Sequence, residues 1–371
     1  MRLITEDAVT ASFGLAADET LARRIGPGSS PPTLRLYTYR SYSTLVGRFQ
    51  NVHHELDVDY CREHRIAINR RPTGGGAILM GADQLGVALV LPARGQSIRA
   101  RELMARFSRG LVSALKRLGV RAGFEGKNDV EVDSRKIAGL GIYRAASKGA
   151  SAGLLFHASL LVGMDVRLML RVLRTPFAKI ADKGIASVEA RITTLRRELG
   201  RDISIDEARE ELACGYAESM GEALDPGCFT PEELGDIEVL ETKKYRAEDW
   251  IFQSSGVADT AGSARVRTPS GMMDIEIRLA GPTIKTVHIG GDFFAAESAI
   301  AELEASLKWR PSHPDAVREA LFGVYAKRNV HGEELSELPI DALATAIDTA
   351  VRNARDPYGC FVKPGPSLSR A

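Results

Sequence analysis

The chain has 371 residues, of which 44% are hydrophobic and 26% are charged, and its formal net charge is +1. This length suits about two globular domains. A nearly neutral chain has no general attraction to nucleic acid or to an anionic membrane, which argues against both as its main partner. No run approaches the roughly 20 apolar residues of a membrane span, and the start does not read as a signal peptide.

The four cysteines, Cys61, Cys214, Cys228 and Cys360, are scattered and form no Cys-x-x-Cys pair. This spacing disfavours a disulfide framework or a zinc site. We therefore expect a cytoplasmic protein in a reducing environment.

The N-terminal two-thirds of the chain mixes helical and strand patterns. Apolar residues recur at helical spacing over 12–24, whereas 33–39 and 43–46 alternate as strands do. The sequence then predicts a helix over 56–64, a strand over 66–69, an irregular loop at 74–76, a strand over 85–91 and an amphipathic helix over 98–118. It further predicts strands over 129–133, 135–143 and 153–162, and helices over 165–173 and 206–223.

Asp-Pro-Gly and charged residues cluster over 225–244, which predicts a domain boundary. Beyond it the patterns predict strands over 266–279 and 283–289 and helices over 295–307, 315–325 and 341–354. The expected fold class is α+β, with a mixed central sheet flanked by helices and a small second α+β domain. The expected domains are 1–235 and 245–356, followed by a poorly ordered tail over 357–371.

The first segment that suggests chemistry is Asn69-Arg-Arg-Pro-Thr-Gly-Gly-Gly-Ala-Ile78. Consecutive glycines let a backbone approach a ligand and present N–H groups to an anion. Thr73 adds a hydroxyl, and Arg70 and Arg71 add cationic donors that suit phosphate or carboxylate oxygens. Because neighbouring strand residues point to opposite faces, one arginine should face the ligand, and we favour Arg71. The alternative is a plain glycine-rich hairpin; the segment is not a P-loop.

A second segment, Gly126–Asp129 followed by Asp133-Ser-Arg-Lys-Ile-Ala-Gly139, predicts a β-hairpin with Asp133-Ser134 as its turn. This register pairs Glu131 with Lys136 and brings both onto one face with Asp129. Asn128 and Asp129 could hold a nucleotide phosphate through Mg²⁺. An ordinary exposed Glu–Lys pair is the alternative.

Two further segments are weaker signals. His157 lies in the apolar run 154–161, where a histidine is more often a satisfied core residue than a catalyst. Lys179, Lys183 and Arg191 form a positive strip that could meet phosphates, although such residues are usually only solvated.

The order and spacing of these segments resemble the lipoate–protein ligase A family. The matching features are Arg-Arg-x-Thr-Gly-Gly-Gly-Ala from Arg70, Asn128-Asp129, Arg-Lys-x-x-Gly from Arg135, His157 before a small residue and Ser159, and Lys-Gly-Ile-x-Ser-Val-x-x-Arg from Lys183. Gly14–Glu19 and Leu45–Gln50 look like the family's first helix and strand. The C-terminal part, with Trp250 and Gly290–Phe294, is similar to the accessory domain of the long-form members.

This resemblance implies a fold shared with biotin–protein ligases and a two-step reaction. ATP and Mg²⁺ convert lipoate or octanoate to an acyl-adenylate, which a carrier lysine then attacks. Lys136 is implied as the catalytic residue. The implied acyl-adenylate contacts are Arg71, Thr73, Gly74, Gly75, Gly76, Ala77, Ile78, Leu79, Gly139, His157 and Ala158. The implied ATP and phosphate contacts are Asn128, Asp129 and Lys183, with Asp129 at the Mg²⁺.

The family's usual carriers are the lipoyl domains of oxoacid dehydrogenase acyltransferase subunits and the glycine-cleavage H protein. We expect a monomer, with the small domain rotating about a hinge within 225–244 between the two steps.

The chain departs from the family pattern at two places. Leu79, Met80 and Gly81 stand where members usually have an aromatic residue, His and Asp, and Phe156-His157-Ala158-Ser159 replaces His-His-Gly-Thr. We interpret these departures as signs of a divergent branch that retains Lys136.

Two alternatives stay open. An ATP-independent octanoyltransferase of the same fold would use a cysteine thioester, but no cysteine lies between Arg62 and Ala213. A non-catalytic protein that binds lipoate or an acylated carrier is the second alternative.

Overall fold

The computed structural model describes residues 1–93, 99–126, 128–145, 153–174, 191–253, 260–268, 271–331, 335 and 338–354. The chain forms two compact units, Met1–Gln253 and Ser254–Ala371. Within the described residues, no helix is long and apolar enough to cross a membrane.

The division between the units lies C-terminal to the 225–244 segment in which the sequence predicted a boundary and a hinge. That segment instead forms β11 (Asp225–Pro226), α10 (Pro231–Leu240) and η1 (Glu241–Tyr245, a π-helical turn) of the first unit. The Thr230 capping box starts α10, and Ile237 and Leu240 then join the core around α1 (Ala11–Ile25). The Asp-Pro-Gly and charged cluster over 225–244 thus marks a turn and a helix start within the first unit.

An eight-stranded mixed sheet in the order β11-β1-β2-β6-β10-β9-β8-β7 organises the first unit. Strand β1 is parallel to β11 and β2, and the other neighbours are antiparallel. The remaining bounds are β1 (Arg2–Val9), β2 (Thr33–Tyr39), β6 (Gln84–Pro92), β7 (Gly123–Glu125), β8 (Asp129–Val132), β9 (Arg135–Ala145) and β10 (Gly153–Leu161). The predicted mixed sheet flanked by helices is confirmed.

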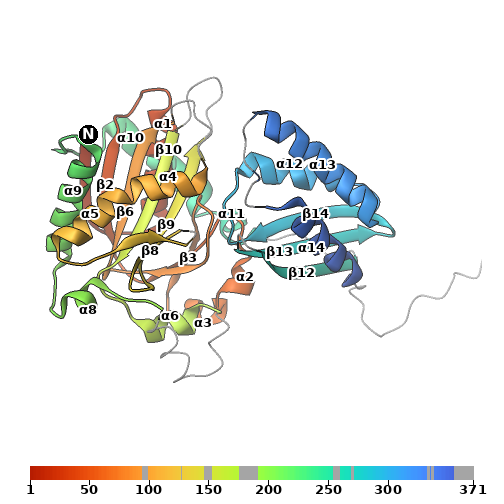
Figure 1. The fold of residues 1–371 in the computed structure, drawn as a ribbon, viewed down its shortest axis with the longest axis horizontal. Coiled ribbons are helices and arrows are strands. Elements are labelled where there is room, and N and C mark those ends of the chain that lie inside the picture. The colour runs from red at the N-terminus through yellow and green to blue at the C-terminus, as the bar shows by residue number, and fades with distance from the viewer. Residues whose placement is uncertain are drawn as a thin grey trace, which may run out of the picture. The chain divides into compact units, whose positions relative to one another are not determined.

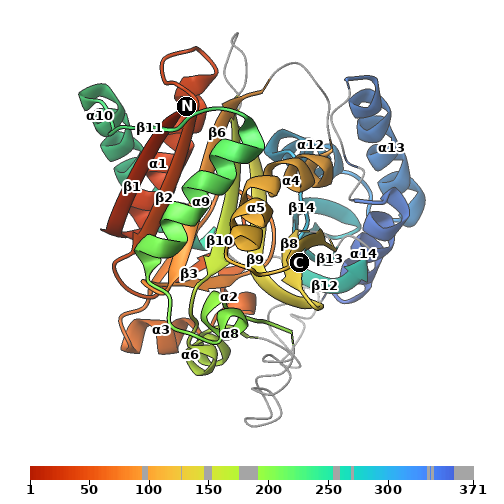
Figure 2. The same ribbon diagram turned by 60° about the vertical axis from the view of Figure 1, so that its left-hand side comes forward.

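Helices pack on both faces of this sheet (Figures 1 and 2). Figure 2 shows α4 (Ala100–Phe107), α5 (Arg109–Arg117) and α9 (Ile205–Met220) passing in front of it. The single helix predicted over 98–118 is divided at Ser108, whose hydroxyl donates to the Ala105 carbonyl 3.1 Å away. Hydrogen bonds of this kind compete with the helical ladder and bend helices.

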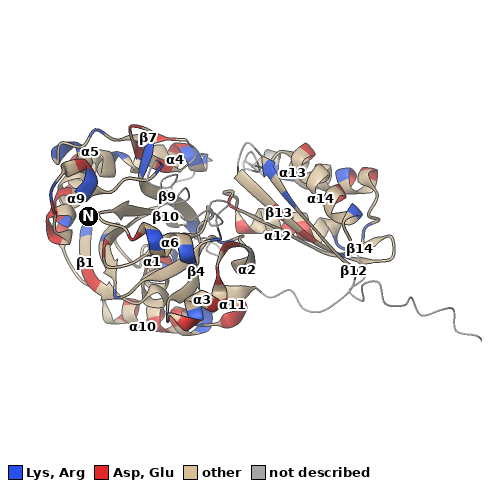
Figure 3. Ribbon diagram, turned by 90° about the horizontal axis from the view of Figure 1, so that it is seen from below, with Lys and Arg blue, Asp and Glu red and all other residues tan. Residues whose placement is uncertain are grey.

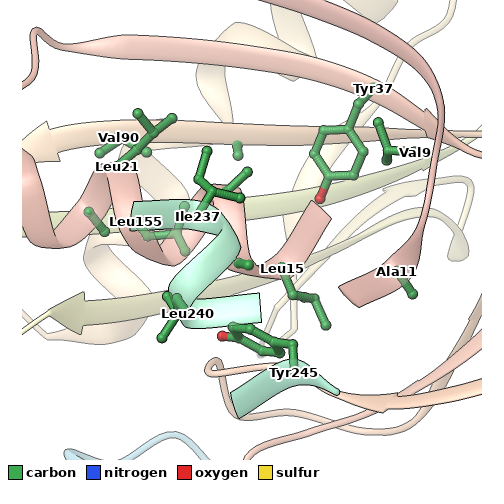
Figure 4. Close-up of a cluster of buried hydrophobic side chains, with 14 of the residues drawn as sticks. Val9, Ala11, Leu15, Leu21, Tyr37, Val90, Leu155, Ile237, Leu240 and Tyr245 are labelled. Atoms are coloured by element: carbon green, nitrogen blue, oxygen red, sulfur yellow. The ribbon is translucent and has the colours of Figure 1, made fainter. Parts of the chain in front are cut away.

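The other face of the sheet is covered by α1. In Figure 4, Leu15 of α1 lies beside Tyr245 of η1 and Leu240 of α10 in one buried cluster. The first helix and residues 237–245, which are far apart in the sequence, therefore pack in one hydrophobic core.

A three-stranded sheet in the order β4-β3-β5 carries the glycine-rich loop of the first unit. It consists of β3 (Ser43–Val46), β4 (Ala67–Arg70) and β5 (Ile78–Met80). The neighbouring short helices are α2 (Val52–Glu55), α3 (Val58–Glu63), α6 (Val166–Val172), α8 (Leu195–Leu199) and α11 (Glu248–Phe252). Among the described strands, β4 pairs with β3 alone, so its other edge is left to non-strand partners.

In the second unit, the described residues form an antiparallel three-stranded sheet and three helices. Its elements are β12 (Thr260–Thr268), β13 (Gly271–Ala280), β14 (Thr283–Gly291), α12 (Glu297–Leu307), α13 (Pro314–His331) and α14 (Ile340–Arg352). The single strand predicted over 266–279 overran a hairpin, because Thr268 pairs with Gly271. The α+β class predicted for this part of the chain is correct.

Candidate active site

The glycine-rich loop between β4 and β5 is in very close contact with the end of β3. A Cβ on Gly47 would lie 2.0 Å from the Gly75 carbonyl oxygen, so only glycine fits there. Gly75 itself has φ +94°, in the left-handed region. The Arg48 amide donates to the Thr73 carbonyl at 2.9 Å and fixes the start of the loop. The loop therefore has a defined shape against β3.

Arg71 supports this loop from within. Its side chain is 8% exposed and donates to the carbonyls of Leu45 at 2.9 Å, Gly74 at 3.1 Å and Gly76 at 2.6 Å. The sequence predicts that Arg71 faces the ligand; its described hydrogen bonds go to two carbonyls of the loop and to Leu45 of β3. The guanidinium suits this role because its donors can bond several carbonyls at once.

Arg70 is also buried, and it too bonds only carbonyl oxygens among the described residues. It donates to the carbonyls of Gly47, Arg48, Gln50, Trp250 and Ile251, at distances from 2.6 to 3.1 Å. Burial, with the nearby Arg48 and Arg71, lowers the pKa of Arg70 to about 9, and burial lowers the pKa of Arg71 to about 10. Both arginines remain cationic at neutral pH, and this region of the loop is electropositive.

The hairpin predicted around Lys136 is present in the predicted register. Asp133 and Ser134 have φ of 47° and 62°, as a type I′ turn requires, and Glu131 lies opposite Lys136. A register shift beyond Glu131 then places Asp129 opposite Gly139. The Lys136 ammonium lies 2.7 Å from an Asp129 carboxylate oxygen, with both side chains about 30% exposed. Burial and the Asp129 charge raise the pKa of Glu131.

Two glycines of β9 create space beside Lys136. A Cβ on Gly139 would lie 3.0 Å from Lys136 Nζ and 3.5 Å from Ser159 Oγ. A Cβ on Gly141 would lie 3.1 Å from Thr73 Oγ1. Because Gly139 and Gly141 point to the same face, Lys136 and the glycine-rich loop meet the same surface of β9 and β10. Among the described residues, the buried Thr73 hydroxyl has no hydrogen-bond partner.

His157 lies on this face, directly opposite Gly141. Its Nε2 is 2.8 Å from Asp18, a fully buried carboxylate of α1 that also binds Arg35 at 2.8 Å and Tyr37 at 2.9 Å. Burial alone would raise the pKa of Asp18, but Arg35 and His157 outweigh it and hold that pKa below 3.8. His157 is thus a paired histidine with a 13% exposed side chain.

Sequence reasoning missed the acidic pair Asp18 and Glu19. Both are fully buried, and Glu19 accepts hydrogen bonds from Lys244, Tyr245 and Arg23. The available signal was two consecutive acids within the apolar helix over 12–24, which requires buried cationic partners.

Other predicted contacts are placed differently. Leu79 is 2% exposed and packs in the core beside α3 and α6, so its side chain is not available to an acyl-adenylate. Ala158 follows His157 in β10 and therefore points to the opposite face of the sheet. Ala77 and Ile78 are partly buried against the cores on either side.

Asn128 has a supporting position. It exchanges backbone and side-chain hydrogen bonds with Leu140, at 2.8 and 3.0 Å, which fixes the start of β8 against β9. Lys183 lies outside the described residues. Within the described part of the chain, no three His, Cys, Asp or Glu residues gather as a preformed metal site. Figure 3 shows acidic and basic residues interspersed along the helices of the first unit.

The comparison with known families adds to this geometry. Residues 10–217 match the model of the lipoyl protein ligase A/B catalytic domain. This match spans α1, the glycine-rich loop, Lys136 and His157. The chain belongs to this family of lipoate ligases and transferases.

Individual relatives within the family differ in their reactions. An octanoyltransferase LipM of Symbiobacterium thermophilum is 31% identical over 64% of this chain and 92% of its own length. The lipoate–protein ligase LplJ of Bacillus subtilis is 25% identical over 88% of this chain and 96% of its own length. A crystal structure of lipoate–protein ligase A bound with ATP is 27% identical, with a TM-score of 0.59 over 68% of this chain and 98% of that one. The enzyme family is therefore established, whereas ligase and transferase relatives both resemble the chain.

Proposed function

We propose that this protein is an ATP-dependent ligase that joins lipoate or octanoate to the ε-amine of a lysine on a carrier protein. The observation that carries the proposal is the position of Lys136 at the surface bounded by Gly139 and Gly141. The sequence has no cysteine between Arg62 and Ala213, the range that contains this site. A transferase working through a thioester needs a thiol at this surface.

The described cysteines do not offer that thiol. Cys61 is fully buried on α3, and burial raises the pKa of its thiol. Cys214 is on α9, and Cys228 follows β11 at the sheet edge opposite to β8. Cys360 lies outside the described residues.

The proposed reaction has two balanced steps. A carboxylate oxygen of the acid attacks the α-phosphorus of ATP, forming acyl-AMP and releasing pyrophosphate. The neutral carrier amine then attacks the acyl carbonyl, the bond to AMP breaks, and the nitrogen gives up one proton as it becomes the amide N–H. Lys136 would offset the negative charge at the carboxylate and at the carbonyl oxygen.

The electropositive loop supports an anionic ligand. Two buried cations support the loop: Arg71 bonds the carbonyls of Gly74 and Gly76, and Arg70 bonds the carbonyl of Gly47, which contacts Gly75. Among the described residues, the hydrogen bonds of both guanidinium groups all go to carbonyl oxygens. A buried charge is costly until an opposite charge compensates it, which a phosphate of ATP or acyl-AMP would do.

Mg²⁺ is compatible with the donors present. It commonly binds one or two carboxylates together with substrate phosphates, so Asp129, with Asn128 beside it, could hold the ion once ATP is bound. The ion would neutralise phosphate charge, and the Asp129 carboxylate would then contact both Mg²⁺ and the Lys136 ammonium. No preformed cage is needed for this binding.

The carriers to test are the lipoyl domains of oxoacid dehydrogenase acyltransferase subunits and the glycine-cleavage H protein, which the family resemblance implies. We further propose that the protein is a cytoplasmic monomer. Cys61, Cys214 and Cys228 are free thiols, as is usual in a reducing compartment.

An intact-mass assay tests the proposed function. The protein, a carrier domain, Mg²⁺ and lipoate or octanoate are incubated with and without ATP. We expect ATP-dependent acylation that Lys136→Ala abolishes and Lys116→Ala, at an exposed site on α5, leaves unchanged. Acyl transfer from an octanoyl carrier without ATP would establish the transferase instead, and acid binding without any carrier modification would indicate a binding protein.

A further inference from the structure

The last segment of the first unit, residues 241–253, is attached to the glycine-rich loop. It comprises η1 and α11, and π-helical turns such as η1 are frequent at functional sites. We call these residues the clasp. One end of the clasp is bound to α1, and the other to the strand that leads into the loop.

The attachment to α1 is ionic and buried. Lys244 Nζ donates to both carboxylate oxygens of Glu19, at 2.8 and 3.0 Å, and the Tyr245 hydroxyl donates to the same group. Burial alone would raise the pKa of Glu19, but Lys244 and Arg23 outweigh it and hold the pKa below 4.5. Because Glu19 is fully buried, this end of the clasp is firmly placed.

The attachment to the loop is an exchange of hydrogen bonds with β4. Trp250 Nε1 donates to the Arg70 carbonyl at 3.0 Å, and Arg70 Nε donates back to the Trp250 carbonyl at 3.0 Å. Asn69 Nδ2 donates to the Tyr245 carbonyl at 2.8 Å. The clasp thus covers the edge of β4 that faces no strand in the described part of the chain.

The Trp250 indole also contacts cations. Lys244 Nζ lies 3.8 Å from a ring centroid of Trp250, and the Arg48 guanidinium carbon lies 4.7 Å from it. Both contacts have cation–π geometry, which stabilises a fixed ring position. Trp250 consequently joins the clasp to β4 and to Arg48, two residues beyond the end of β3.

We propose that Trp250 is a positioning residue for acyl-adenylate binding, acting through Arg70 on the glycine-rich loop. This inference rests on the proposed function. Arg70 ties the clasp to the carbonyls of Gly47 and Gln50, and Gly47 is in closest contact with Gly75. Loss of the Trp250 contacts leaves Lys136 in place but loosens the surface that holds the nucleotide.

The test compares Trp250→Phe, which keeps a ring and removes the indole N–H, with Trp250→Ala. Asp249→Asn, at an exposed position of α11, is the matched control. Thermal melting verifies that each full-length variant is folded. The measurements are carrier acylation at varied ATP, acid and carrier concentrations, and calorimetric binding of a non-hydrolysable acyl-sulfamoyl adenosine.

We expect Trp250→Phe to raise the KM for ATP and to weaken analogue binding about three- to tenfold, as one lost hydrogen bond would. Trp250→Ala should have a larger effect, and the KM for the carrier should stay unchanged in both. Folded variants with unchanged analogue binding and an unchanged KM for ATP would overturn the proposal, as would an equal loss in every kinetic parameter.

If the parent chain binds the analogue without acylating a carrier, the proposed function fails, and the ratio of analogue affinities between parent and variants still decides the role of Trp250. A parent chain that does neither would overturn both.

Discussion

Gly139 leaves the space that the Lys136 side chain occupies. A Cβ at this position would lie 3.0 Å from Lys136 Nζ, the end of a flexible side chain. We expect Gly139→Ala to displace the ammonium and to lower kcat for carrier acylation about 10- to 100-fold, since small misplacements of a reacting group are costly. The free energy of unfolding should change by less than about 1 kcal/mol, because the side chain can move.

Gly123→Ala on β7, at the edge of the same sheet, is the control for this substitution. Its Cβ would meet only Glu125 Oε1, at 3.8 Å, an ordinary contact. We compare kcat of the two variants at saturating substrates. This comparison separates displacement of the Lys136 ammonium from the general effect of adding a methyl group to the sheet. Full activity in Gly139→Ala would show that the position of Lys136 is not critical.

At the level of elements, α1 depends on the buried Glu19. Its carboxyl has a lowered pKa, so the folded state binds the proton less readily than the unfolded state. The resulting stabilisation is present above the unfolded pKa of about 4.5 and is lost as the pH falls through the lower folded value. We expect Glu19→Gln to lower the free energy of unfolding by about 3 kcal/mol at pH 7 and by progressively less below about pH 4.5.

Urea denaturation between pH 7 and pH 3.5 measures this difference. Glu238→Gln, at an exposed position of α10, should show a small effect at every pH. A constant difference between Glu19→Gln and the parent chain across the range would contradict the ionic role of Glu19.

Helices α5 and α9 are in close backbone contact at Gly215. A Cβ there would lie 2.4 Å from the Gly110 carbonyl oxygen and 2.5 Å from the Ala114 nitrogen, and neither atom can move freely. We expect Gly215→Ala to destabilise the protein by about 2–3 kcal/mol through overpacking. Gly235→Ala in α10 meets no atom within 4 Å and should instead stabilise by about 0.5–1 kcal/mol. Equal urea midpoints for the two variants would contradict this account of the helix contact.

The elements that the sequence predicted well are those with local signals. The hairpin over 129–143 was predicted in register because its turn and its alternation are adjacent in sequence. Strand β1 was missed because Glu6 and Asp7 interrupt its apolar pattern. The clasp was missed because its partners are remote, as with Lys244 and Glu19, which are 225 residues apart.

The same distinction applies to the candidate site. The glycine-rich loop and the Lys136–Asp129 pair could be predicted, since both are short motifs. The direction of the Arg71 side chain could not, because it depends on Leu45 of β3 and on the carbonyls that the loop itself presents. A strand pattern states which residues alternate, but the nearest acceptors decide where a long side chain points.

For the whole molecule, the decisive question is whether acyl transfer passes through a thiol. The chain resembles both LipM and LplJ, so overall similarity does not separate a transferase from a ligase. A cysteine-free variant separates them, with Cys61→Ala in the core and Cys214→Ser, Cys228→Ser and Cys360→Ser elsewhere. If the reaction passes through acyl-AMP, this variant should retain ATP-dependent carrier acylation within about threefold of the parent, because no step needs a thiolate.

The control for this variant is thermal melting, since Cys61 is fully buried and its truncation removes core contacts. We expect a lower Tm together with retained activity at 25 °C. Iodoacetamide treatment of the parent chain should likewise spare activity, because the exposed Cys214 and Cys228 take no part in the proposed reaction. The buried Cys61 thiol has a raised pKa and reacts slowly. A folded cysteine-free variant that no longer acylates the carrier would assign the reaction to a thioester and the protein to the transferases.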